Sequence, residues 1–291
     1  MSLKKELKIA RPTLSESSIT TYNSLLCSLF KKVFNNEDLD VNKFDETKKI
    51  LDHLSGLPPN RRKTVLSALV VISNKPEYRK VMLEDVNNYN KEMSKQEKTE
   101  TQEKAWLSDD DINSTFTRLK DNANTIYKKK IYTTRDLQDL QDYIILSVLS
   151  GIFIPPRRSL DYCNMKIKNV NKYTDNYLDK NELCFNSYKT SRFYGLQKIE
   201  ISKELKSILT KWLKVNPTEY LLFDINNNKL TSVKLNQRLH KIFGKPSSVN
   251  ALRHSYLTSK YGDTIKTNNS LSEDLTDMGS SLAQARVYIK E

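Results

Sequence analysis

Residues 90–104 divide the sequence into two parts. This stretch, NKEMSKQEKTETQEK, contains one apolar residue, Met93, and shows no hydrophobic periodicity. Such a composition is typical of a flexible tether or a solvated helix rather than of a packed core. At 291 residues the chain is long enough for two modest domains, each with its own core. We therefore predict a boundary near residue 104, between a domain of residues 1–104 and a domain of residues 105–291.

The first domain is predicted to be helical. Apolar and aromatic residues recur at three- and four-residue spacing over residues 14–33, with Ser15 as the expected N-cap. Residues 41–54 repeat this pattern less sharply and end before a breaker cluster at residues 56–59. A third helix should follow this cluster, and its first turn contains the basic residues Arg61, Arg62 and Lys63.

The second domain is predicted to be mainly helical with a small antiparallel β-sheet, which places the chain in the α+β class. Ser108 and the three aspartates after it indicate a helix start, because carboxylates favour the positive end of a helix. Further helices are expected over residues 137–153, 202–213 and 235–243. The segments with β-favouring composition are residues 166–170, 182–187 and 196–201.

The charge balance favours a polyanionic partner. Lys and Arg number 48 against 35 Asp and Glu, which gives a formal net charge of +13. Nucleic acid is the commonest partner of so basic a protein. A basic protein that binds no nucleic acid is the alternative that charge alone leaves open.

The remaining composition argues against several other classes. Three cysteines without a CxxC pair predict neither a disulfide framework nor a zinc site, and three scattered histidines predict no metal cluster. No apolar run reaches the roughly 18 residues of a membrane span, and the N-terminal segment MSLKKELKIARP lacks the hydrophobic core of a signal peptide. We expect a soluble, intracellular protein without a metal or another cofactor.

Four residues have the chemistry that metal-free cleavage of a phosphodiester requires. Such cleavage needs a nucleophile, stabilisation of charge on the phosphorane, and an acid for the leaving group. The guanidinium forks of Arg158 and Arg253 would match two non-bridging oxygens, Lys189 would protonate the leaving oxygen, and Tyr288 would attack phosphorus. Each residue also has an ordinary structural interpretation, such as an ion pair, a solvated hairpin lysine or an apolar contact.

The segment around the first arginine resembles a motif of a known family. IPPRRSLDY, residues 154–162, is similar to the first-arginine motif of the tyrosine recombinases and integrases. In that motif an acidic residue follows the arginine by three positions. This offset favours Arg158, with Asp161 behind it, over the neighbouring Arg157.

Two further segments follow in the family's order and spacing. NSYKTSRFYGLQKIEI, residues 186–201, resembles the family's β-hairpin, whose turn-proximal lysine would be Lys189. NALRHSYLT, residues 250–258, resembles the second arginine box and assigns Arg253.

The terminal segment MGSSLAQARVYIK, residues 278–290, resembles the family's last box and assigns Tyr288 as the nucleophile. Two positions differ from the family's pattern: Asn250 and Ser280 stand where histidines are usual. An amide or a hydroxyl can donate a hydrogen bond to phosphate but cannot shuttle a proton near neutral pH as imidazole does. Proton transfer would then depend on Lys189, on His254 or on the substrate, and Asn250 would act as a hydrogen-bond donor in the catalytic set.

The N-terminal part also resembles this family. RPTLSESSITTYNSLLCSLF, residues 11–30, is similar to the start of its helical core-DNA-binding domain, and RRKTVLSAL, residues 61–69, is similar to a later DNA-facing helix. The resemblance implies DNA contacts from a set of polar and basic residues in these two segments: Ser15, Ser18, Tyr22, Arg61, Arg62 and Lys63. The alternatives are that Tyr22 belongs to the core and that residues 61–63 form only an exposed basic turn.

The resemblance implies a site-specific recombinase or integrase of the viral or mobile-element type. It would cut and rejoin double-stranded DNA through a 3′-phosphotyrosine intermediate, as a tetramer assembled on DNA, and would be nuclear, viral or cytoplasmic according to its origin. A catalytically impaired DNA-binding or architectural protein of the same fold is one alternative, for which Asn250 and Ser280 argue. A type IB topoisomerase is another, although the helical N-terminal domain argues against it.

Overall fold

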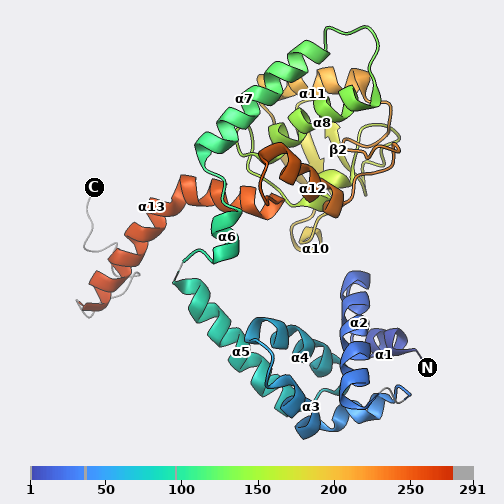
Figure 1. The fold of residues 1–291 in the computed structure, drawn as a ribbon, viewed down its shortest axis with the longest axis vertical. Coiled ribbons are helices and arrows are strands. Elements are labelled where there is room, and N and C mark those ends of the chain that lie inside the picture. The colour runs from blue at the N-terminus through green and yellow to red at the C-terminus, as the bar shows by residue number, and fades with distance from the viewer. Residues whose placement is uncertain (1, 36–37, 96, 278–291) are drawn as a thin grey trace. The chain divides into compact units, whose positions relative to one another are not determined.

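The computed structural model describes residues 2–35, 38–95 and 97–277, and the chain divides into two compact units, residues 1–97 and 98–291. Each unit has its own buried apolar core. Figure 1 shows the helices and strands of both units. The predicted boundary near residue 104 falls at the end of the short helix α6 (Glu100–Lys104). None of the helices in the described ranges is long and apolar enough to cross a membrane.

The first unit is helical, as predicted. Its elements are α1 (Leu3–Ala10), α2 (Glu16–Val33), the 3₁₀ helix η1 (Val41–Asp45), α3 (Thr47–Leu54), α4 (Pro59–Ser73) and α5 (Pro76–Ser94). Ser15 caps α2 as expected, since its side chain accepts a hydrogen bond from the backbone N–H of Ser18. The single helix predicted over residues 41–54 was wrong in one respect, because the chain forms η1 and α3 with a break at Glu46.

Helix α5 has little amphipathic pattern, and its packing against α4 explains why it forms. Only Tyr78 and Asp85 are buried along its length. The Tyr78 hydroxyl donates a hydrogen bond to the carbonyl of Phe44 at 2.8 Å, and the Asp85 carboxylate accepts two from Arg62 of α4. Together with Val81 and Met82, which pack against the core of this unit, these contacts hold a helix that is polar over most of its surface.

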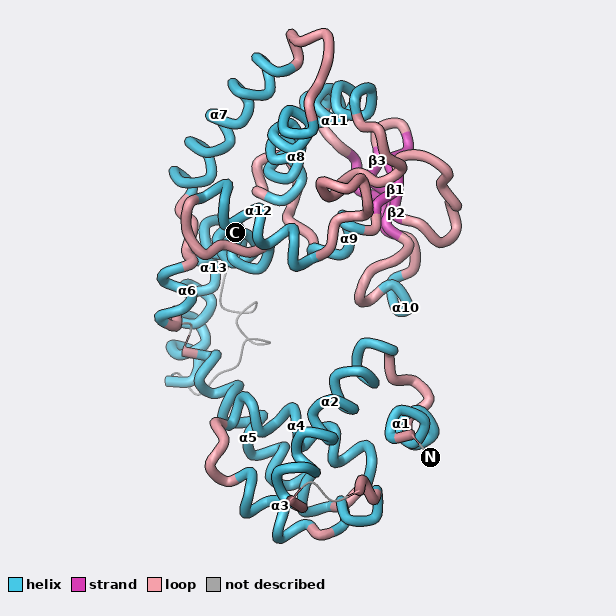
Figure 2. Tube along the Cα trace, turned by 45° about the vertical axis from the view of Figure 1, so that its right-hand side comes forward, coloured by secondary structure: helices cyan, strands magenta, loops and turns pink. Residues whose placement is uncertain are grey.

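The second unit contains most of the helices and the only strands among the described residues. The helices after α6 are α7 (Asp109–Ile126), α8 (Thr134–Leu149), α9 (Ser159–Cys163), α10 (Ser191–Tyr194), α11 (Lys203–Val215), α12 (Ser232–Phe243) and α13 (Val249–Asp277). Helix α8 is buried along most of its length and lies between α7 and α11 (Figure 2). The predicted cap Ser108 is confirmed, because its side chain accepts a hydrogen bond from the third helical residue, and Ser202 caps α11 in the same way.

The sheet has four strands in the order β1 (Met165–Lys166), β2 (Asn176–Asp179), β3 (Glu182–Phe185) and β4 (Gln197–Glu200). The pairs β2–β3 and β3–β4 are antiparallel, whereas β1 pairs with β2 in parallel, so the sheet is mixed. The α+β class is confirmed. Strand β2 was missed, and the predicted strand over residues 166–170 is reduced to the two-residue β1.

Candidate active site

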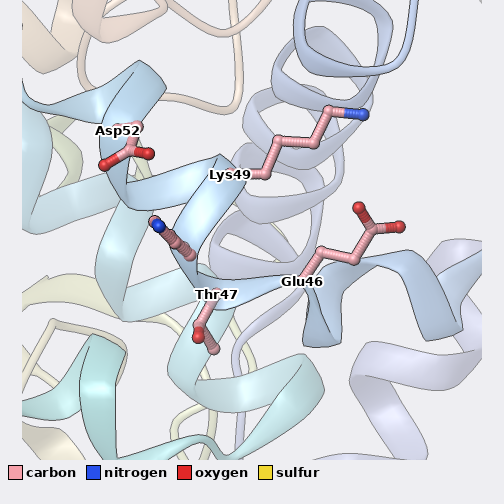
Figure 3. A pocket seen from close by; sticks show the side chains of 5 residues that line it. Glu46, Thr47, Lys49 and Asp52 are labelled. Carbon is pink, nitrogen blue, oxygen red and sulfur yellow. The ribbon is translucent and has the colours of Figure 1, made fainter.

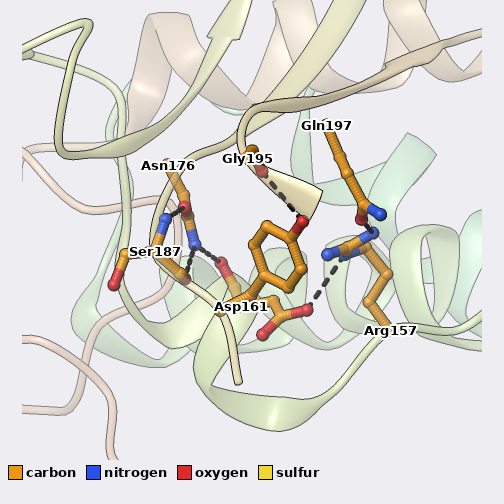
Figure 4. A network of polar contacts seen from close by, with 7 residues as sticks. Arg157, Asp161, Asn176, Ser187, Gly195 and Gln197 are labelled. Carbon is orange, nitrogen blue, oxygen red and sulfur yellow. Dashed lines mark hydrogen bonds and ion pairs between the residues drawn. The ribbon is translucent and has the colours of Figure 1, made fainter. Parts of the chain in front are cut away.

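Arg157 is held on every side by neighbouring groups. Its Nε donates a hydrogen bond to Oδ2 of Asp161 at 2.9 Å, and its Nη1 donates one to Oε1 of Gln197 at 2.8 Å (Figure 4). The guanidinium carbon also lies 4.0 Å from the ring centre of Phe185 and 5.0 Å from that of Tyr188. Arg157 therefore ties the loop before α9 to strands β3 and β4.

Asp161 and Asn176 extend this network into the interior. Asp161 is 2% exposed, and its burial raises the pKa of its carboxyl group although Arg157 lowers it. The fully buried Asn176 donates hydrogen bonds to the carbonyls of Asp161 and Ser187, at 2.9 and 2.8 Å. The backbone N–H of Ser187 donates one back to Oδ1 of Asn176 at 2.8 Å. Strand β2 thus fixes the end of α9 against the segment that follows β3.

Arg158 and Arg253, which are far apart in the sequence, line one hollow of about 240 Å³. Arg158 is the residue before the first turn of α9, with an extended backbone, and Arg253 lies near the start of α13. Both side chains are half-buried. The hollow is lined by Pro155, Pro156, Arg157, Arg158, Asp161, Tyr188, Thr190, Gln197, Ile199 and Arg253. Since three arginines face one aspartate in this set, the hollow is suited to an anion.

The start of α13, and with it Arg253, is fixed by local hydrogen bonds and burial. Ser248 accepts a hydrogen bond from the backbone N–H of Ala251 at 3.1 Å, and Asn236 of α12 accepts one from that of Val249 at 3.2 Å. Leu252 is fully buried in the core of the unit. Arg253 therefore projects from a helical turn whose backbone is well held.

Gly151 and Tyr256 make a second close contact between α13 and the segment before Arg157. Gly151 has φ +91°, and a Cβ there would overlap Cδ2 of Tyr256 and lie 3.2 Å from its Cε2. Only glycine fits this position without a shift of its neighbours. The contact lies one helical turn after Arg253 and joins the two segments that supply arginines to the hollow.

The other predicted catalytic residues are less closely gathered. Lys189 is exposed in the turn between β3 and α10, and its neighbours Tyr188 and Thr190 line the hollow although Lys189 does not. Asn250 is exposed in the first turn of α13 and does not line the hollow, and His254 is also exposed. The predicted nucleophile Tyr288 and the position Ser280 lie outside the described residues.

In the first unit, the predicted DNA-contacting residues at the start of α2 have structural roles. The Oγ atoms of Ser15 and Ser18 are 2.9 Å apart, and Ser15 is the N-cap. Tyr22 is half-buried and packs against the core of this unit. These contacts do not test the predicted role of the three residues in DNA binding, which stays a prediction.

The basic residues at the start of α4 differ from one another. Arg61 is exposed. Arg62 forms a two-pronged ion pair with the buried Asp85, at 2.8 and 2.6 Å, and this hydrogen bonding raises the pKa of Arg62. The ammonium of Lys63 lies 3.2 Å from the ring centre of Tyr89. Arg61 is thus the member of this set most open to a phosphate.

A further hollow of the first unit gathers residues that the sequence did not single out. It lies at the start of α3 and is lined by Glu46, Thr47, Lys48, Lys49 and Asp52 (Figure 3). Its lining contains two carboxylates and two ammonium groups, so the hollow favours neither an anion nor a cation. In the described ranges, no group of three or more His, Cys, Asp or Glu residues is placed to hold a metal ion.

Sequence reasoning missed Arg157, Gln197 and Tyr188 as parts of the site. The spacing favours Arg158 over Arg157, because Asp161 follows Arg158 by three positions. In the structure Asp161 pairs with Arg157, four positions away, and Arg158 is the extended residue before α9. The adjacent arginines therefore divide two tasks, and the spacing alone could not show which arginine takes which.

Neither a protein-family model nor a curated protein sequence matches the chain. Solved structures do show distant similarity. A lambda integrase (residues 75–356) dimer bound to a COC′ core site has 15% sequence identity and a TM-score of 0.46, with 91% of each chain covered. The XerH site-specific recombinase bound to its difH substrate has 16% identity and a TM-score of 0.38, with 90% of this chain and 84% of that chain covered. A lambda integrase tetramer bound to a Holliday junction has 13% identity and a TM-score of 0.43, with 89% and 69% covered.

Proposed function

We propose that the chain is a DNA strand transferase of the tyrosine recombinase type, which cuts and rejoins duplex DNA through a 3′-phosphotyrosine link. The observation that carries this proposal is the hollow that Arg158 and Arg253 line together. Two guanidinium groups converging from distant parts of the sequence suit the two non-bridging oxygens of a phosphodiester. The turn with Lys189 begins directly after Tyr188, at the edge of the same hollow.

The proposed mechanism assigns one task to each residue. The Tyr288 oxygen attacks phosphorus, the bond from phosphorus to the 5′-oxygen breaks, and Lys189 gives that oxygen a proton. Arg158 and Arg253 stabilise the charge that develops on the phosphorane. Arg157 takes no direct part but holds the loop that carries Arg158. A 5′-hydroxyl later attacks the phosphotyrosine, so the bond energy is retained and no ATP is needed. The mechanism also requires no metal.

We further propose that several copies act together on DNA. Rejoining to a different strand requires two cleaved duplexes to be held side by side, which a single active site cannot do. Assembly as a tetramer on double-stranded DNA meets this requirement. The viral or mobile-element type and the cellular location follow only from the resemblance of the motifs.

A catalytically impaired DNA-binding protein is the second candidate, and Asn250 favours it. The side chain at this position is exposed and does not line the hollow. An amide there can donate a hydrogen bond to phosphate but cannot accept the proton of the attacking tyrosine, whose reference pKa is near 10.

Variants at Asn250 separate the two candidates. If Asn250 donates to a phosphate oxygen during cleavage, Asn250→Ala should lower the single-turnover cleavage rate roughly 10- to 1000-fold, whereas Asn250→His should keep or raise it. Arg253→Ala should lower the rate further than either variant. Wild-type rates in Asn250→Ala would show that the position is structural. No cleavage by any variant or by the wild type would favour the DNA-binding protein.

A covalent-capture experiment tests the function without knowledge of the target sequence. The protein is incubated with a pool of nicked duplexes of randomised sequence, in which cleavage releases a short strand and traps the adduct. We expect a DNA adduct that resists denaturant and that Arg158→Ala and Arg253→Ala fail to form. Adducts of equal yield from both variants would remove the arginines from the proposed mechanism.

A further inference from the structure

The connection between β3 and β4 carries two adjacent exposed aromatic residues, Phe193 and Tyr194. This segment, residues 188–196, contains the one-turn helix α10, which lies at the outer end of the connection in both views (Figures 1 and 2). The side chains of Phe193 and Tyr194 are 70% and 69% exposed, and Leu196 is 45% exposed. Burying two such aromatic side chains is strongly favourable, so their joint exposure on one folded tip indicates a binding surface. We call residues 188–196 the aromatic tip.

The aromatic tip is a braced structure. The hydroxyl of Tyr188 donates a hydrogen bond to the carbonyl of Gly195 at 2.8 Å, which closes the segment on itself. The N–H of Gly195 donates to the carbonyl of Ser191 at 2.7 Å, and Gly195 has φ +62° and ψ −151°, a conformation that is almost restricted to glycine. Tyr188 also lies over the guanidinium of Arg157 and lines the hollow. The tip is therefore fixed at the rim of the candidate phosphate site.

The charge of the tip favours nucleic acid over an acidic or apolar protein surface. The tip, residues 188–196, contains no Asp or Glu but two basic residues, Lys189 and Arg192, and Lys198 follows it in β4. Lys198 pairs with Glu182 of β3, and the guanidinium of Arg192 lies 4.6 Å from the ring centre of Phe193. Aromatic rings interleaved with cationic groups are the chemistry with which proteins bind bases and the backbone between them.

We infer that Phe193 and Tyr194 stack on DNA bases that are unpaired beside the phosphate held by Arg158 and Arg253. This inference rests on the proposed function, because strand exchange requires base pairs next to the cut to open. An opened base loses its stacking partners, and an aromatic side chain of the tip, which Tyr188 and Thr190 anchor at the rim of the site, replaces them. The tip would then hold the displaced base while the free 5′-end leaves the hollow.

The test compares two duplexes within each protein variant. Dissociation constants are measured by fluorescence anisotropy, in low salt, for a fully paired duplex and for the same duplex with a short mismatched bubble. We expect the wild type to prefer the bubble, and Phe193→Ala/Tyr194→Ala to lose about 5- to 100-fold of this preference while keeping its affinity for the paired duplex. A variant that merely misfolds would weaken both affinities together.

Two single variants serve as matched controls. Tyr173→Ala removes an aromatic side chain that is 91% exposed outside the tip, and it should leave both affinities unchanged. Arg192→Ala removes a charge within the tip and should weaken binding to both duplexes alike, with a smaller salt dependence.

Other outcomes overturn the inference in distinguishable ways. An unchanged bubble preference in the double variant would remove the tip from base recognition and leave the proposed function standing. A wild-type protein that binds neither duplex would reject the proposed function and the tip together. If light scattering shows that the wild type forms an oligomer without DNA and that the double variant does not, the tip contacts a second copy of the chain instead of DNA bases.

Discussion

Arg157 and Arg158 are adjacent in the sequence and both line the hollow, but they differ in their partners, because the Arg157 side chain is hydrogen-bonded to Asp161 and Gln197. The side chains of Arg157 and Asp161 are 16% and 3% exposed, and the pair is joined at 2.9 Å. Removal of one partner from a buried pair leaves an uncompensated charge. Arg158 lines the hollow without a hydrogen bond of its own side chain to the described residues.

Alanine substitutions should therefore separate stability from binding. Arg157→Ala should lower the free energy of unfolding by about 3 kcal/mol, because Asp161 stays buried without its partner. Arg158→Ala should change it by no more than about 0.5 kcal/mol. Urea denaturation followed by circular dichroism measures both values. Equal losses in the two variants would contradict the division of tasks between the arginines.

At single residues of the site, some features could be predicted from the sequence and others could not. Arg158 and Arg253 were singled out by their chemistry and by the resemblance of their motifs, and the structure brings both into one hollow. Which of Arg157 and Arg158 pairs with Asp161 could not be predicted, because it depends on the backbone conformation of Arg158, the residue before α9. Gln197 and Asn176 carried no signal at all, since polar amides become informative only when the fold surrounds them with unpaired groups.

At the scale of elements, local signals predicted the helices better than the strands. Ser15 and Ser108 were found as caps because capping depends on residues within one turn. Strand β2 was missed because its four residues, NYLD, show no alternation and pair only through β1 and β3. Helix α5 was not predicted because its buried face is narrow: Tyr78 and Asp85 are buried, Val81 and Met82 are half-buried, and most of the remaining surface is polar.

The contact between Gly151 and Tyr256 should be measurable as a coupling between α13 and the segment before α9. Gly151→Ala should destabilise the protein by about 1–3 kcal/mol, because it combines a positive φ with a clash against the Tyr256 ring. In a double-mutant cycle with Tyr256→Ala, part of this loss should be recovered. Strict additivity of the two substitutions would mean that the ring does not oppose a side chain at position 151.

The stability that Asp136 contributes at the N-terminus of α8 should depend on pH. Hydrogen bonds from Lys129 and from Thr133 lower the pKa of Asp136 to about 2. The unfolded chain, whose Asp titrates near 3.9, binds more protons between these values. Stability from this carboxylate is therefore complete above about pH 4 and is lost as the pH falls towards about 2.

Asp136→Asn should expose this effect. The variant should be less stable than the wild type at neutral pH, and the difference should shrink as the pH falls from about 4 to about 2. Urea denaturation over this range measures the difference. Asp121→Asn, at an exposed position of α7, is the control and should differ little from the wild type. A difference for Asp136→Asn that does not vary with pH would contradict the assigned cause.

For the whole molecule, the formal charge of +13 predicts strongly salt-dependent binding to duplex DNA. Each phosphate neutralised by Lys or Arg releases condensed counterions, so the logarithm of the binding constant should fall linearly with the logarithm of the salt concentration. Arg61→Ala should reduce this slope by about 1, because Arg61 is the exposed arginine at the start of α4. Binding that does not change between low and physiological salt would contradict a role on DNA.

The most direct test of the central proposal is to identify the residue that becomes linked to DNA. Wild-type protein and Tyr288→Phe are incubated with the randomised pool of nicked duplexes, and the adducts are digested and mapped by mass spectrometry. We predict a nucleotide on Tyr288 in the wild type, with no adduct in Tyr288→Phe and with DNA affinity nearly unchanged. An adduct that persists in Tyr288→Phe, or one mapped to another residue, would contradict the proposed mechanism.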